Sequence, residues 1–165
     1  MALQSITALA TITLQSASAT VEFSGIPDTY RDFIVVYRGG VNGDYDTPLR
    51  FNSDLAGNYY GVNMRGDGSS ATGSSNSGLG YMTFGLRNVV VPTTSYTTVY
   101  LEILDYSATD KHKTVLQRVD DATKQTLAQA WRWANSANAI SSLTFSCSGG
   151  TYNSGSTFAL FGRIA

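Results

Sequence analysis

The stretch Thr98-Val99-Tyr100-Leu101-Glu102-Ile103 decides the fold class. Apolar and polar side chains alternate strictly here, which is the pattern of a strand with one buried face and one exposed face. Thr20–Phe23 repeats the pattern, whereas Phe33–Tyr37 is apolar on both faces, as in a central strand or one covered by a second molecule. Further runs that predict strands cover residues 58–64, 81–84, 114–117, 143–147 and 158–164.

Residues 121–134 fit two interpretations. Leu127, Trp131 and Ala134 lie at helical spacing, and the alanines favour a helix. At a period of two, Leu127, Gln129, Trp131 and Trp133 share one face, and a tryptophan pair at positions i and i+2 is more typical of a sheet. We therefore predict a strand, with a short helical turn near 135–142.

The organisation of the chain is that of one all-β domain. Its 165 residues suit a single domain, and glycine- and asparagine-rich segments separate most of the apolar runs. Short strands with such punctuation are typical of an antiparallel sandwich or barrel. We expect one domain over residues 1–165.

Composition excludes two classes of function. Charged residues make up 14% of the chain and the formal net charge is −1. A nucleic-acid-binding protein needs lysines and arginines to neutralise phosphates, and a polybasic membrane anchor needs them as well. The start of the chain, Met1–Ile6, also lacks the basic and apolar regions of a signal peptide, which indicates synthesis and folding in a cytosol.

Two segments are predicted to lie outside the core. Gly66–Gly78 is a glycine- and serine-rich run with no large apolar side chain, and we predict a flexible loop of 13 residues, 66–78. Met1–Leu9 is small, apolar and uncharged. It has two interpretations, an arm that reaches a neighbouring molecule or simply the first strand.

The residue types that commonly take part in catalysis are not arranged in this sequence in a way that points to an enzyme. His112, the one histidine, lies between two lysines, and the one cysteine, Cys147, shares a predicted strand face with Leu143 and Phe145 and is expected in the core. No pair of carboxylates is singled out by its position. Asn52–Asp54 and Asp44–Asp46 place oxygens at alternate positions, but Asn and Asp turns explain both without calcium. We predict no catalytic residue, no metal and no cofactor.

Aromatic residues are the remaining resource, with ten tyrosines, seven phenylalanines and two tryptophans. Exposed rings stack on sugars, and the same rings serve as core or as anchors of protein interfaces. The candidates for sugar stacking are Tyr45, Tyr59, Tyr60, Tyr96, Tyr100, Trp131 and Trp133. We favour packing, and the predicted oligomer or partner interface consists of Phe33, Ile34, Val36, Tyr37, Tyr45, Trp131 and Trp133.

Three stretches together resemble the small virion proteins of tailed bacteriophages, many from cyanobacterial and aquatic hosts. They are Thr20–Phe33 (T-V-E-F-S-G-I-P-D-T-Y-R-D-F), Leu101–Tyr106 (L-E-I-L-D-Y) and Phe158–Ile164 (F-A-L-F-G-R-I), where Phe161 replaces a frequent tyrosine. The resemblance implies a jelly-roll-like antiparallel β-sandwich that assembles as a trimer, and it carries over no catalytic residue.

From this resemblance we expect a phage virion structural protein, specifically a homotrimeric decoration (cement) protein that stabilises the head shell. Its partners would then be two further copies of itself and the major capsid protein, and its location the virion after synthesis in the host cytoplasm. The alternatives are a receptor-binding domain of a tail fibre or baseplate and a carbohydrate-binding β-sandwich module.

Overall fold

The computed structural model describes residues 5–42, 46–85, 96–120 and 125–164. The protein is a single-domain, all-β, jelly-roll-like sandwich of antiparallel sheets, as the sequence predicted. The alternating stretch 98–103 lies in strand β9, in which Val99, Leu101 and Ile103 are fully buried and Tyr100 is exposed.

The larger sheet has eight strands, in the spatial order β1 (Ile6–Thr13), β14 (Thr157–Arg163), β3 (Asp32–Gly39), β9 (Thr97–Leu104), β10 (Lys113–Asp120), β11 (Thr126–Trp133), β6 (Tyr59–Gly66) and β7 (Ala71–Leu79). The smaller sheet has the order β2 (Thr20–Phe23), β12 (Leu143–Ser146), β5 (Pro48–Phe51) and β8 (Met82–Thr83). A short ribbon pairs β13 (Thr151–Tyr152) with β4 (Val41–Asn42).

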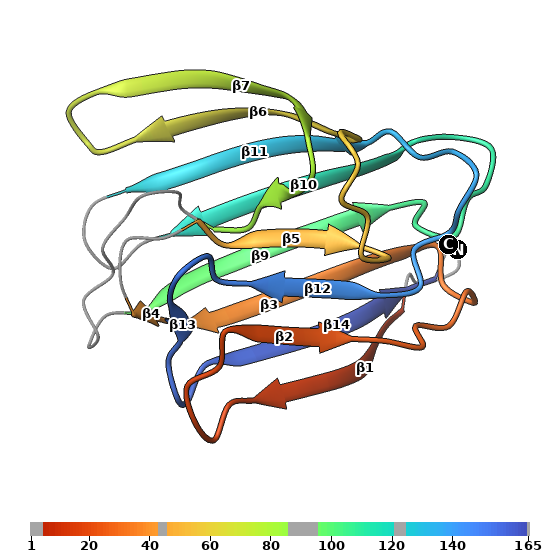
Figure 1. Cartoon of the computed structure of the whole chain (residues 1–165), viewed down its shortest axis with the longest axis horizontal. Coiled ribbons are helices and arrows are strands. Elements are labelled where there is room, and N and C mark those ends of the chain that lie inside the picture. The colour runs from red at the N-terminus through yellow and green to blue at the C-terminus, as the bar shows by residue number, and fades with distance from the viewer. Residues whose placement is uncertain (1–4, 43–45, 86–95, 121–124, 165) are drawn as a thin grey trace.

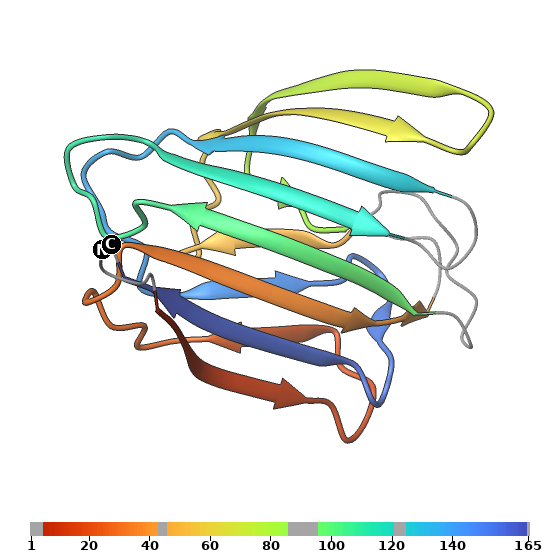
Figure 2. The same ribbon diagram turned by 180° about the vertical axis from the view of Figure 1, so that it is seen from behind.

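The two sheets are stacked, but the smaller one covers only part of the larger one. Figure 1 shows β2, β12 and β5 in front of the large sheet, and Figure 2 shows the uncovered back of that sheet. In both views the β6–β7 hairpin extends beyond the edge of the small sheet. Among the described residues, no second layer of strands covers the other face of the large sheet.

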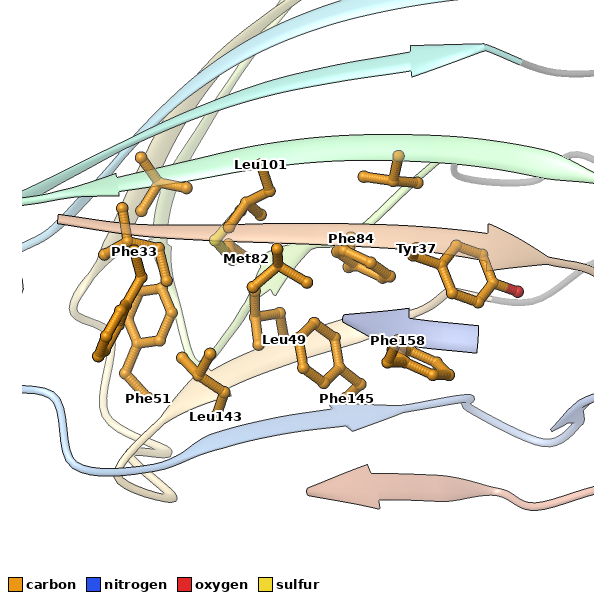
Figure 3. Close-up of a cluster of buried hydrophobic side chains, with 14 of the residues drawn as sticks. Phe33, Tyr37, Leu49, Phe51, Met82, Phe84, Leu101, Leu143, Phe145 and Phe158 are labelled. Carbon is orange, nitrogen blue, oxygen red and sulfur yellow. The ribbon is translucent and has the colours of Figure 1, made fainter. Parts of the chain in front are cut away.

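The core lies between the sheets and is rich in aromatic rings (Figure 3). Phe145 of β12 is 4.7 Å from Phe84 and 5.3 Å from Phe158 of β14, measured between ring centroids. Tyr37 of β3 lies 4.7 Å from Phe158 in the same way. Burial of such rings is worth about 1.5–3 kcal/mol each, and tilted or edge-to-face contacts add to it. Cys147 is also in this core, as the sequence predicted.

The ambiguous segment 121–134 contains a strand. β11 pairs along its whole length with β10 and with β6, and Leu127, Gln129, Trp131 and Trp133 face inward together. The prediction of a strand is confirmed from residue 126 onward. The prediction of a helical turn near 135–142 is wrong, because these residues form an irregular connection that contains no helical turn.

Two peripheral segments contain strands, and one of these strands corrects the prediction of a loop at 66–78. Most of the expected loop 66–78 is strand β7, which follows a tight turn and pairs with β6 from Gly66–Ala71 to Tyr59–Leu79. A strand can pair through its backbone without apolar side chains, so the composition of this segment did not reveal that it is a strand. Of the two interpretations of Met1–Leu9, the structure agrees with the first strand: Ile6 and the residues after it form β1, which pairs with β14. Residues 1–4 lie outside the described part.

Candidate binding surfaces on the large sheet

The open face of the large sheet, here called the outer face, carries the side chains that point away from the small sheet. Because side chains alternate along a strand, Tyr100 and Glu102 lie on this face while their neighbours Leu101 and Ile103 lie in the core. Exposed apolar groups gather here. Val62 is 57% exposed and Met64 69%, both on β6.

An ion-pair network ties together three strands of the outer face. Asp32 on β3 is 1% exposed, and its Oδ2 accepts hydrogen bonds from Nε (3.0 Å) and Nη2 (2.8 Å) of Arg163 on β14. Nη1 of Arg163 donates to Glu102 on β9 at 2.9 Å, and the Tyr100 hydroxyl donates to the same carboxylate. The hydrogen bond to Asp32 raises the pKa of the Arg163 guanidinium. Both carboxylates are therefore held by one arginine.

Three stretches of the chain, residues 20–33, 101–106 and 158–164, meet at this end of the sandwich. The Tyr106 hydroxyl donates to the carbonyl of Pro27 and accepts from the amide of Tyr30. A Cβ at Gly162 would lie 2.4 Å from Cγ of Tyr30, so this position has room only for glycine. The amide of Asp105 donates to Asp32. These three stretches thus pack against one another as scaffold.

A shallow depression of about 390 Å³ lies on the outer face where β10, β11, β6 and β7 run side by side. Thr114, Arg132 and Tyr60 form one row across three strands, with Arg132 between the other two. The Arg132 guanidinium carbon is 4.6 Å from the centre of the Tyr60 ring, a cation–π contact. Ala130, half-buried, lines the next row. We call this feature the Arg132 depression.

The polar groups around the Arg132 depression are available to a ligand. His112 and Asn76 also line it, beside Thr114. Within the described ranges, Arg132 has no carboxylate within ion-pair distance, and neither Arg132 nor His112 has a side-chain hydrogen bond. A guanidinium without an acidic partner is a ready site for an anion.

The second surface is the free edge of β7. All but two of its nine residues are exposed, and it contains neither lysine nor proline, two residues that commonly protect edge strands. The amide of Asp67 donates to the carbonyl of Ser70, which makes Asp67 and Ser70 a hydrogen-bonded pair. From this pair onward, hydrogen-bonded and non-hydrogen-bonded pairs alternate along the β6–β7 ladder. This alternation directs the amides of Thr72 and Ser74 toward β6 and those of Gly73 and Ser75 outward.

One buried charge lies inside the sandwich. Lys113 is fully buried, and its ammonium donates to the carbonyls of Asn135 (2.9 Å) and Asn138 (2.5 Å) and lies 5.3 Å from the Trp133 ring centre. Burial lowers the pKa of this lysine. The ammonium holds the irregular connection after β11 against the sheet, which is a structural role.

The predicted interface residues do not form a surface patch. Phe33, Tyr37, Trp131 and Trp133 are at most 3% exposed and belong to the core of a single chain. Ile34 lies on the outer face but is only 4% exposed, and Val36 beside it is half-buried. Tyr45 lies outside the described residues. Apolarity on both faces of β3 thus reflects its central position in the sheet, which buries Ile34 between neighbouring strands.

Among the candidates for sugar stacking, three lie in the core and two are exposed: Tyr59, Trp131 and Trp133 are buried, whereas Tyr96 and Tyr100 are exposed. Tyr60 is half-buried at the Arg132 depression. Sequence reasoning named this ring but missed Arg132, because the strand register that places the two side by side is not visible in the sequence. It also missed β7, for which the sequence offers no apolar periodicity.

The other residues examined for chemistry lie apart. His112 is exposed, as its lysine-flanked position predicted. Asn52 and Asp54 have structural roles. Oδ1 of Asn52 accepts from the amides of Ser141 and Ser142 in the segment before β12, and Asp54 accepts from the amide of Ala56 in its own turn. The described residues contain no group of three or more histidine, cysteine or acidic side chains placed to hold a metal ion. They also contain no helix long and apolar enough to cross a membrane.

Comparisons with known proteins identify no family for this chain. No family model matches it, and no curated protein does. Among solved structures, the marine PL-14 alginate lyase from Aplysia kurodai is similar over 93% of this chain and 79% of its own, with 11% identity and a TM-score of 0.33. Likeness at that level carries no argument about activity, so function has to be inferred from the surfaces described above.

Proposed function

We propose that this protein is a structural component of a phage virion, in its most specific form a homotrimeric decoration protein that binds the major capsid protein on the head. The phage assignment is supported by the three resembling stretches alone. That they pack together as scaffold suits a structural protein. The proposal includes no enzymatic activity.

The observation that carries the assembly part is the open edge of β7. A long, exposed edge strand offers a row of unpaired amides and carbonyls to another chain, and most monomeric proteins block such edges. Here nothing in the strand itself does so. The exposed Met64 on the adjacent β6 provides apolar area beside that row, which a pairing chain would bury.

A closed trimer needs two different surfaces that fit each other, because only a head-to-tail contact generates a threefold ring. The large sheet has two such surfaces, the edge of β7 and the edge of β1 at its opposite side. β1 has eight residues, six of them exposed, and β7 has nine. In the proposed trimer, β7 of each protomer pairs with β1 of the next.

The assembly is tested with proline at position 73. The amide of Gly73 points outward, so Gly73→Pro removes one donor from the free edge without removing one from the β6–β7 ladder. Nothing but the Asn63 carbonyl, at 3.7 Å, comes near a side chain placed there. Gly73→Ala adds a side chain and keeps the amide, and is the matched control.

Sedimentation of the wild type and the Ala variant should show a species of three chains, about 53 kDa from the 17.7 kDa chain mass, and the Pro variant a single chain. A wild type that is monomeric at micromolar concentration contradicts the assembly. Labelled protein located by cryo-EM on phage heads supports the decoration role; its presence only on tails supports the tail-fibre alternative instead.

A further inference from the structure

We infer that the Arg132 depression binds an acidic sugar, a pyranose ring that carries a carboxylate or a sulfate. This function is separate from assembly and does not rest on the proposed virion role. Three properties of the depression lead to it: an unpaired cation, a lining with apolar and hydrogen-bonding parts, and an open position on the sheet.

The cation selects the charge of the ligand. The Arg132 guanidinium lies on the Tyr60 ring and has no acidic partner in the described part of the chain. Stacking on the ring restricts the motion of the guanidinium and leaves its N–H groups free for two parallel hydrogen bonds to a carboxylate or sulfate. His112, exposed beside it, adds a further polar group at the same end.

The remaining lining selects a sugar. Ala130 and the exposed Val62 supply an apolar floor for the C–H face of a pyranose, while Thr114 and Asn76 supply a hydroxyl and an amide for its ring hydroxyls. The volume of about 390 Å³ falls within the usual range for small-ligand sites.

Two other anionic ligands fit less well. Phosphate groups are commonly cradled by free backbone amides in loops or at helix ends. The backbone of β10 and β11 is paired on both sides at Thr114, Ala130 and Arg132, so these central residues of the depression have no such amides to offer. Nucleic acid needs many cations, and the chain as a whole carries a net charge of −1.

The test is calorimetric titration of the whole protein with a galacturonate tetrasaccharide, its fully methyl-esterified form and a heparin-derived tetrasaccharide. Binding of the first with loss of affinity on esterification identifies a carboxylate ligand; binding of the heparin fragment alone identifies a sulfate. An acidic pentapeptide of glutamates that binds as tightly as the sugars contradicts the sugar assignment.

Variants locate the site. Arg132→Gln should weaken binding at least tenfold, and Ala130→Leu should do the same by filling the floor while the charge stays. The matched control is Arg118→Gln, because Arg118 is an exposed arginine on the same face that lies outside the depression. It should bind as the wild type does.

Thermal melting confirms that each variant folds, and amide chemical shifts of the wild type provide a readout without any substitution. The shifts should move at residues 60–62, 112–114 and 130–132. No binding at millimolar sugar, or equal binding by Arg132→Gln, overturns the inference. Because Gly73 does not line the depression, Gly73→Pro should retain sugar binding even as a monomer, which separates this outcome from that of the assembly test.

Discussion

Asp32 carries a charge that folding has removed from water. Its carboxylate is compensated by the Arg163 guanidinium and by the backbone amide of Asp105, and it connects the strand pair β3–β14 to the turn after β9. A second arginine, Arg31, approaches the same carboxylate at 3.5 Å but is half exposed. Arg163 and Arg31 thus both pair with Asp32, but Arg163 is largely buried whereas Arg31 is half exposed.

Replacing Asp32 by Asn should lower the free energy of unfolding by about 3 kcal/mol, because the largely buried Arg163 then keeps only Glu102 as an acidic partner. Arg31→Gln, which removes the exposed partner of the same carboxylate, should cost less than about 1 kcal/mol. Urea denaturation of the two variants measures both values. Equal costs would show that burial does not distinguish the two ion pairs.

Asp54 predicts a dependence of stability on acid. Burial opposes its charge, but hydrogen bonds from Asn58, the Trp133 indole and the Ala56 amide outweigh that effect and lower the pKa of Asp54 below its ordinary 3.8. A carboxyl group with a lower pKa in the folded state stabilises fully above its ordinary pKa and loses this contribution as the pH falls through the folded value.

The stability difference between the wild type and Asp54→Asn should therefore be constant from pH 7 to about 5 and shrink below about 4. Urea denaturation at pH 7, 5, 4 and 3 measures it. A difference that stays the same at pH 3 contradicts the assigned hydrogen bonds.

Strands β6 and β11 pack closely because Gly61 of β6 has no side chain where Trp131 of β11 lies. The Trp131 ring lies directly over Gly61, where a Cβ would come within 2.4 Å of it. A neighbouring large ring cannot give way by that much without leaving its position in the core. The tight contact explains why a glycine occupies the third position of β6, two residues after the buried Tyr59.

Gly61→Ala should destabilise the protein by about 1–3 kcal/mol through displacement of the Trp131 ring. Gly73→Ala on the neighbouring strand meets only ordinary contacts and should change stability by less than about 0.5 kcal/mol. Thermal unfolding of the pair, with tryptophan fluorescence to report the ring, checks this. A silent Gly61→Ala would mean that the ring is not fixed there.

The sequence predicted a strand correctly where apolar and polar side chains alternate. It did not predict the strand whose side chains show no such alternation. β9, β2 and β11 each bury every second residue, and this pattern is local. β7 offers glycine, serine and asparagine on both faces. The Arg132 depression depends on which strands are neighbours, a long-range property, so its aromatic member was noticed but its charged member was not.

For the molecule as a whole, the layering predicts a gradient of local stability. Amides in β3 and β9 are bonded within the sheet and covered by the aromatic core, whereas the β6–β7 hairpin extends beyond the small sheet. Hydrogen exchange should be slowest in β3 and β9 and fastest in β7, including the amides of β7 that point toward β6. Mass spectrometry of peptides covering each strand measures the order, and equal protection of β7 and β9 contradicts it.

The pairing of β1 with β14 has a consequence for how the chain is made. A ribosome releases the first strand long before it has synthesised the strand that β1 must lie against, and β14 is also the partner of β3 on its other side. The two strands that flank β14 in the large sheet therefore wait for β14 to emerge. Contacts this distant in sequence are slow to form, so until β14 has emerged the nascent chain carries unpaired strand edges that invite aggregation. Chaperones that shield such edges should bind it during translation.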